Sequence, residues 1–145
     1  MREIEFRGQR KDNKEWVYGC LVGEKYIVCN WEINNDYGDE TDFYATDFYE
    51  VIPETVGQYT GEKDKKCKEI YEGDILRCWD NDENVYLTIV VLNGGAFSIG
   101  VNQCDYDYTA IGWALESDVI ECEIVDNIHE NQELLELLEV ADDEN

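Results

Sequence analysis

Short runs of aromatic and β-branched residues, separated by turn-forming residues, recur along most of this chain. The clearest pair, residues 85–92 and 96–101, flanks Asn93-Gly94-Gly95, which supplies the positive φ angles that a tight hairpin needs. A similar pair spans residues 15–31 and turns at Gly23-Glu24. Because such runs favour extended backbone over helix, the sequence predicts a mainly β protein.

Further segments continue this pattern on both sides of the two hairpins. The polar residues 34–42 are expected to form a loop, and residues 62–68 (EKDKKCK) a charged turn. The remaining extended segments are expected at residues 43–52, 55–60, 75–79, 111–115 and 119–125.

The C-terminal residues change period and predict a helix. Asn127 can cap a helix start, and Glu130 follows three residues later. An apolar side then appears among glutamates, made of Leu134, Leu135, Leu137 and Leu138. A helix this short needs a surface to pack on, either the body of the protein or another subunit.

Together these segments predict an all-β fold with a short C-terminal helix, in one compact unit. Residues 1–60 are expected to form an N-terminal β-sheet portion. Residues 61–126 are expected to form a twisted, barrel-like portion, with a small barrel made by residues 74–125. Residues 127–145 are expected to form the helix and an acidic tail.

The cysteines and the N-terminal residues indicate a reducing compartment. The chain has six cysteines but no CxxC pair, and Cys20, Cys29, Cys78 and Cys122 lie in strand-like runs. We expect reduced, mostly buried thiols that act as small apolar side chains. The charged N-terminal residues lack the apolar segment of a signal peptide, which predicts a cytoplasmic protein.

The charge is strongly negative and unevenly distributed. Eleven basic residues stand against 35 acidic ones, and the net charge is −24. Residues 78–145 contain 17 acidic residues and no Lys or Arg, so this part alone carries −17. Direct nucleic-acid binding and binding to an anionic membrane both need clustered cations, so neither is expected. A basic protein partner is compatible with this charge.

Acidic residues along the strands and the predicted helix could imitate the phosphates of a nucleic acid. In residues 119–125, Glu121 and Glu123 are expected on one face, opposite Ile120, Cys122 and Ile124. An ordinary solvated outer face gives the same pattern. The candidate partner-binding residues are Asp105, Asp107, Glu116, Asp118, Glu121, Glu123, Asp126, Glu130, Glu133 and Glu136.

The chain offers little for catalysis. Its single histidine, His129, has no Ser or Cys beside it in sequence that would suggest a catalytic pair. The residues from Asp80 onward (DNDEN) resemble the start of a calcium loop, but Val85 and Val91 stand where Gly and Glu are needed. No catalytic residue, metal or cofactor is expected. A metal-dependent hydrolase using Asp80 and Asp82 is the enzymatic alternative.

Residues 55–77 (TVGQYTGEKDKKCKEIYEGDILR) resemble the signature of the YopX family, which bacteriophages and prophages encode widely. That signature reads as QYTG, then a charged turn, then KEIYEGDI. Residues 2–7 (REIEFR) and residues 126–135 resemble the opening and closing segments of the family, so the likeness spans residues 1 to about 138. The matching motif residues are Gln58, Tyr59, Thr60, Gly61, Ile70, Tyr71, Glu72, Gly73, Asp74 and Ile75.

The resemblance implies a β-rich fold of phage type and a place in the cytoplasm of a bacterial host. The family has no established catalytic residues to carry over. Its motif also has a structural explanation, because Gly61 and Gly73 allow turns and Asp74 begins a barrel strand in which Ile75 is buried. One departure is Cys67, which stands where a glycine of the charged turn is usual.

Three functional hypotheses follow. The first is a non-enzymatic phage or prophage accessory protein that binds a protein partner, through its acidic surface and by nucleic-acid mimicry. The second is a homo-oligomeric structural protein or one that sequesters a small ligand. The third is the carboxylate-based metal-dependent enzyme.

Overall fold

The protein is described here from a computed structural model. The structure describes residues 4–37, 40–93, 95–100, 108–117, 120–131, 133–134 and 136, with backbone alone for residues 34–37, 40–43, 100 and 108. The chain divides into two units, Met1–Gln58 and Tyr59–Asn145. Each unit is described by itself.

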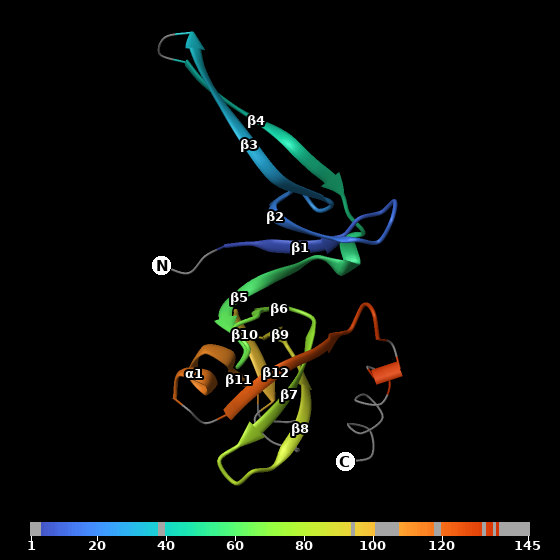
Figure 1. Cartoon of the computed structure of the whole chain (residues 1–145), viewed down its shortest axis with the longest axis vertical. Helices are drawn as coiled ribbons and strands as arrows, with labels where there is room; N and C mark the ends of the chain where they lie inside the picture. The colour runs from blue at the N-terminus through green and yellow to red at the C-terminus, as the bar shows by residue number, and fades with distance from the viewer. Residues whose placement is uncertain are drawn as a thin grey trace. The chain divides into compact units, whose positions relative to one another are not determined.

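The first unit is an antiparallel sheet in which β1 lies between β2 and the start of β5, followed outward by β3 and β4 (Figure 1). Its buried centre includes Ile27 and Val51, and Gly8 lets these two side chains approach the sheet. A Cβ at Gly8 would lie 3.0 Å from Val51 Cγ2. The elements are β1 (Phe6–Gln9), β2 (Trp16–Val22), β3 (Tyr26–Tyr37), β4 (Glu40–Glu50), the 3-10 turn η1 (Pro53–Thr55) and the beginning of β5 (Gly57–Lys63).

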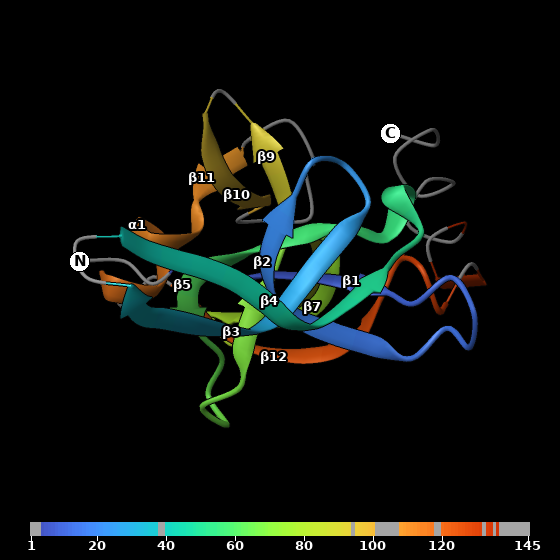
Figure 2. The same cartoon turned by 90° about the horizontal axis from the view of Figure 1, so that it is seen from above.

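The predicted hairpin at residues 15–31 is confirmed, with Gly23 at φ 65° in its turn. The predicted loop at residues 34–42 is wrong, because β3 runs to Tyr37 and β4 begins at Glu40. The two strands pair in a long twisted hairpin, with register shifts around Asn30 and after Asn34 (Figure 2). Turn-forming residue types therefore did not end the strands here.

The second unit contains two three-stranded antiparallel sheets, β12-β7-β8 and β11-β10-β9, and the hairpin of β5 with β6. In Figure 1 the helix α1 lies beside β10 and β11. The elements are the rest of β5, β6 (Glu69–Tyr71), β7 (Asp74–Asp80), β8 (Val85–Ile89), β9 (Val91–Asn93), β10 (Ala96–Gly100), β11 (Tyr108–Ala110), α1 (Ile111–Glu116) and β12 (Ile120–Asn127).

An apolar core joins β6, β7, β8, β10, α1 and β12 of the second unit. Alternate residues of β7, β8, β10 and β12 enter it, as the period of two predicts. The core contains Ile70, Leu76, Cys78, Tyr86, Val90, Phe97, Ile99, Ile111, Ala114, Ile120 and Cys122.

The predicted strand at residues 111–115 is wrong, because these residues form the helix α1. Ile111 and Ala114 are buried and Leu115 packs against the core, whereas Trp113 is exposed. This spacing of three and four residues is helical, and a run of five apolar residues is too short for its period to decide between strand and helix.

The mainly β class is confirmed, but the predicted barrel at residues 74–125 is wrong, because the sheets are open. The expected long strand 85–92 is split at Val90: its first part pairs with β7 and its last part with β10. The N–H of Gly73 donates to the Val90 carbonyl at 2.9 Å, and the N–H of Val90 donates to the Asp74 carbonyl at 3.0 Å. Among the described residues, the two sheets share no strand.

The C-terminal segment begins as a turn and not as a helix. The Oδ1 atom of Asn127 accepts the N–H groups of His129 and Glu130, both at 3.0 Å, and so caps a turn over residues 128–130. Residues 133, 134 and 136 are helical, and Asn131 Oδ1 accepts the N–H of Leu134 at 3.0 Å. The helix predicted from Asn127 therefore starts later, and Leu135, Leu137 and Leu138 lie outside the described side chains. None of the helices in the described ranges is long and apolar enough to cross a bilayer.

The expectation of mostly buried cysteines holds only in part. Cys78 and Cys122 are buried as directly opposite neighbours on β7 and β12. Cys20 and Cys29 are exposed, because the strands of the first unit that carry them leave one face open to solvent. The sequence run alone does not reveal which face of a strand is covered.

Candidate functional site

An open groove of about 740 Å³ lies on the outward face of the β12-β7-β8 sheet. Its lining includes Lys65, Trp79, Asp80, Glu83, Val85 and Glu121. With Asn81 and Ile120, which also line it, the groove combines one aromatic ring, two aliphatic side chains, one amide, one cation and three carboxylates.

The strand register places the floor of this groove. Trp79 of β7 lies directly opposite Val85 of β8 on one side and opposite Glu121 of β12 on the other. Opposite residues of an antiparallel pair share a face. Cys78 and Cys122 point to the core, so the three neighbours Val85, Trp79 and Glu121 form a row on the outer face.

The turn between β7 and β8 forms one end of the groove. The carboxylate of Asp80 accepts the N–H groups of Asp82 and Asn84, both at 2.9 Å, and the Asn84 side-chain amide at 3.1 Å. The bonds from Asn84 lower the pKa of Asp80, so this group is ionised at neutral pH. Glu83 takes φ 65° in the same turn, which brings its side chain to the groove.

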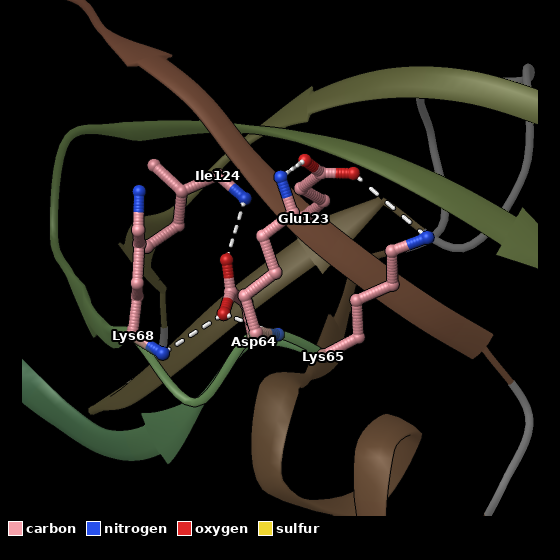
Figure 3. A network of polar contacts seen from close by, with 6 residues as sticks. Asp64, Lys65, Lys68, Glu123 and Ile124 are labelled. Atoms are coloured by element: carbon pink, nitrogen blue, oxygen red, sulfur yellow. Dashed lines mark hydrogen bonds and ion pairs between the residues drawn. The ribbon is translucent and has the colours of Figure 1, made fainter.

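The loop after β5 contributes Lys65 to the groove, and Asp64 fixes this loop to β12 (Figure 3). Asp64 Oδ1 accepts the N–H groups of Lys66 and Lys68 at 2.9 Å, and Oδ2 accepts the N–H of Ile124 at 3.0 Å. The N–H of Lys65 also donates to the Cys122 carbonyl at 2.9 Å. Burial opposes the charge on Asp64, but the three backbone donors together outweigh it and hold its pKa below the ordinary value.

Two lysines of this loop reach the outer face of the sheet. Lys65 Nζ lies 4.0 Å from the centre of the Trp79 ring, a cation–π contact. Lys66 Nζ lies 2.5 Å from Glu123 Oε1, and Lys65 Nζ lies 3.8 Å from Glu123 Oε2 (Figure 3). The bond from Lys66 is the main cause that lowers the pKa of Glu123. Glu123 is therefore satisfied within the chain.

The structure sorts the predicted acidic residues into different roles. Glu121 lines the groove, and Glu116, Glu133 and Glu136 are exposed elsewhere. Asp126 accepts the N–H of Asn127 and the side-chain amide of Asn131, and Glu130 accepts the side-chain amide of Asn127. The candidates outside the described residues are Asp105, Asp107 and Asp118.

The charge on Glu116 also affects a neighbouring carboxylate. Burial, and next the nearby Glu116, raise the pKa of Glu62. Glu62 Oε1 lies 3.2 Å from where a Cβ would stand on Gly112 of α1, so a glycine at that position leaves room for it. Among the described residues, no group of three His, Cys, Asp or Glu side chains is placed to hold a metal ion.

A smaller hollow of about 240 Å³ lies in the first unit, beside Arg10, Lys11 and Glu50. Arg10 Nη2 pairs with Asp12 at 2.7 Å, and Lys11 and Lys25 pair with Glu50 at 3.9 and 3.3 Å. Because these charges are matched within the hollow, the groove of the second unit is the stronger candidate site.

Comparison of the sequence with known protein families identifies the family of this chain. The family model described as YopX protein matches residues 5–136. The chain belongs to the YopX family. No curated protein matches the sequence.

Two solved structures resemble the YopX chain in fold. Protein EF1440 from Enterococcus faecalis aligns with a TM-score of 0.61 at 22% identity, covering 93% of this chain and 99% of that one. Protein yopX from Bacillus subtilis aligns with a TM-score of 0.53 at 19% identity, covering 93% of this chain and 97% of that one. At these identities the likeness establishes the fold alone.

The first half of the YopX motif pairs with its second half. Tyr59 of β5 lies opposite Tyr71 of β6, and their ring centres are 5.6 Å apart. Thr60 Oγ1 donates to the Ile70 carbonyl at 2.8 Å. Gly61 takes φ 90° where the register of the two strands shifts. These residues form a hairpin that carries the Asp64 loop at its end.

The second half of the YopX motif makes the turn from β6 to β7. Asp74 Oδ2 accepts the N–H of Tyr71 at 2.8 Å, and Gly73 takes φ 93° between them. The Gly73 carbonyl accepts the N–H of Ile128 at 2.9 Å, which attaches the C-terminal turn to this point. A Cβ on Gly73 would lie 3.3 Å from His129 Nε2.

Of the groove residues, the sequence identified Glu121 as a binding candidate but not Lys65, Trp79, Glu83 or Val85. The alternation of residues 75–79 was a signal for Trp79, because it places Arg77 and Trp79 on the face opposite Cys78. No local signal places Lys65 there, since its position depends on the bond between Asp64 and Ile124, 60 residues apart.

Proposed function

We propose that this YopX protein is a non-enzymatic phage or prophage accessory protein that binds a basic protein partner through carboxylates of its second unit. The observation that carries the proposal is the charge of residues 78–145, which contain 17 acidic residues and no Lys or Arg. A cationic partner is attracted to such a surface from a distance and oriented by it.

The acidic residues that remain available in the second unit support this role. Glu116, Glu121, Glu133 and Glu136 are exposed, whereas Glu123, Asp126 and Glu130 already bond within the chain. A partner carrying lysines or arginines would meet the first group without breaking the intramolecular contacts of the second.

The test is affinity capture from a bacterial lysate with the tagged protein, washed at low and at high salt and analysed by mass spectrometry. We expect a basic protein that is retained at low salt and released at high salt, because salt screens exposed charges. Recovery of the bait alone at both salt concentrations, or a partner held regardless of salt, would contradict the proposal.

Two charge-reversal variants make the capture specific. The first combines Glu121→Lys, Glu133→Lys and Glu136→Lys in the second unit. The matched control combines Glu24→Lys, Asp47→Lys and Glu54→Lys, exposed residues of the first unit, and changes the net charge equally. We expect the first variant to lose the partner and the control to keep it.

A further inference from the structure

Resting on the proposed function, we infer that the Trp79 groove is the subsite for a lysine or arginine side chain of the partner, and that Lys65 is an intramolecular occupant which the partner displaces. Lys65 Nζ already lies 4.0 Å from the centre of the Trp79 ring. An indole ring attracts a cation over its face because the face carries partial negative charge. The Lys65 contact is therefore an intramolecular example of a cation bound on this ring.

The charges around the ring favour a further cation. Asp80, Glu83 and Glu121 line the groove, and Lys65 is the one cation among the described residues that line it. One positive charge against three negative ones leaves the groove at −2. Its volume of about 740 Å³ is also much larger than one lysine side chain needs, so a partner's side chain and its neighbouring backbone have room.

Lys65 holds this position weakly. Its side chain is 43% exposed, and its distance of 3.8 Å to Glu123 is long, whereas Lys66 makes the short contact with that carboxylate. The loop backbone is fixed independently, by Asp64 and by the bond from the Lys65 N–H to the Cys122 carbonyl. The Lys65 side chain can therefore leave the ring while the backbone stays in place and Glu123 keeps a partner.

The geometry of an aromatic face beside carboxylates favours arginine over lysine. A guanidinium is planar and more weakly hydrated than an ammonium, so it can stack on the ring and donate sideways to two oxygens at once. We expect an arginine-rich peptide to bind more tightly than a lysine-rich peptide of equal length, and a glycine-serine peptide not to bind.

The decisive measurement is the dissociation constant of the arginine-rich peptide for four variants, by calorimetric titration at low salt. Lys65→Gln is compared with Lys63→Gln, an exposed residue outside the groove whose substitution changes the net charge equally. Lys65→Gln removes the internal competitor. We therefore expect the dissociation constant of the peptide to be about threefold lower for Lys65→Gln than for Lys63→Gln.

The second pair is Glu121→Gln in the groove and Glu133→Gln, which is exposed outside it. We expect Glu121→Gln to weaken binding about threefold and Glu133→Gln to change it much less. Both variants alter exposed side chains, so the fold should survive. Tryptophan fluorescence that changes with the peptide in wild type, and not in Trp79→Phe, would place the peptide on this ring.

The outcomes separate this inference from the proposed function. If both glutamate variants weaken binding equally and Lys65→Gln acts like Lys63→Gln, binding is spread over the acidic surface, and the groove is not the subsite although the proposed function stands. If no basic peptide binds the wild-type protein at low salt, both this inference and the proposed function are contradicted.

Discussion

At the scale of single residues, Asp64 shows how one buried carboxylate can organise a loop. It is only 5% exposed, yet it is ionised because three backbone N–H groups point at it. Burial alone would favour the neutral acid, so the donors decide its charge. The same bonds fix the backbone that carries Lys65, whose side chain lines the groove, and Lys66, whose side chain pairs with Glu123.

Replacing Asp64 by Asn should destabilise the fold. The amide keeps one accepting oxygen but presents an NH₂ group toward one of the three donors, which leaves a buried N–H unsatisfied. We expect a loss of about 2 kcal/mol in the free energy of unfolding, measured in urea. Asp82→Asn, at an exposed position of a hairpin turn, is the control and should change little. Equal stability of the two variants would contradict the role of Asp64.

The pH dependence of this contribution follows from the direction of the pKa. The pKa of Asp64 is lower in the folded protein than in the unfolded chain. Its stabilisation is therefore complete above the ordinary aspartate pKa of about 3.9 and is lost as the pH falls through the lower folded value. The difference in unfolding free energy between wild type and Asp64→Asn should shrink as the pH falls below about 4. A difference that stays constant over this range would argue against an ionised Asp64.

Cys67 carries a backbone strain that a glycine would relieve. It takes φ 64° in the exposed loop, a region that non-glycine residues occupy at a cost. Cys67→Gly should raise the free energy of unfolding by about 0.5–1 kcal/mol, after allowing for the greater freedom of glycine in the unfolded chain. Cys67→Ala keeps the Cβ and is the control, which should bring no such gain. Denaturant unfolding of the three proteins measures both effects.

At the scale of elements, β7 and β12 combine an inert inner face with a charged outer one. Cys78 and Cys122 lie opposite each other inside, and burial raises the pKa of each thiol to about 12. On the outside, the same two strands carry Trp79 and Glu121. The period of two thus separates the core from the candidate site within one pair of strands.

This separation predicts which cysteines react. Iodoacetamide at about pH 8 should modify Cys20, Cys29 and Cys67, which are exposed, and leave Cys78 and Cys122 unmodified, because a buried thiol that is not ionised is a poor nucleophile. Peptide mass spectrometry of the native protein reads the sites directly, and unfolding in denaturant should expose the two protected thiols. Modification of Cys78 in the native protein would show that the sheet does not cover it.

The elements also show how much of the fold can be predicted from the sequence. Turn glycines and alternation predicted the hairpin at Gly23 and much of β7 and β12, because there the local preference and the tertiary packing agree. The same reasoning failed at residues 111–115, where the run is too short to show a period, and at Val90, where bonds to Gly73 and Asp74 divide a strand. Of the groove residues, the sequence singled out only Asp80 and Glu121 as candidates, since the placement of Lys65 depends on a contact between residues far apart in the chain.

At the scale of the whole molecule, the charge of −24 acts on stability as well as on binding. Like charges repel in the compact state, and added salt screens this repulsion. Sodium chloride should therefore raise the melting temperature while it weakens the binding of a basic partner. A neutral osmolyte at equal osmolality is the control for general solvent effects. A melting temperature that falls as sodium chloride is added would contradict the repulsion.

The bonds by which Asp64 holds its loop to β12 have a consequence for how such proteins can diversify. The carboxylate holds the main chain of the loop through N–H groups, which every residue except proline possesses. The side chain at position 65 can therefore change while the main chain keeps its path, whereas the Lys66 side chain also pairs with Glu123. Selection acting on position 65 can change what the groove recognises while the backbone that carries it is kept.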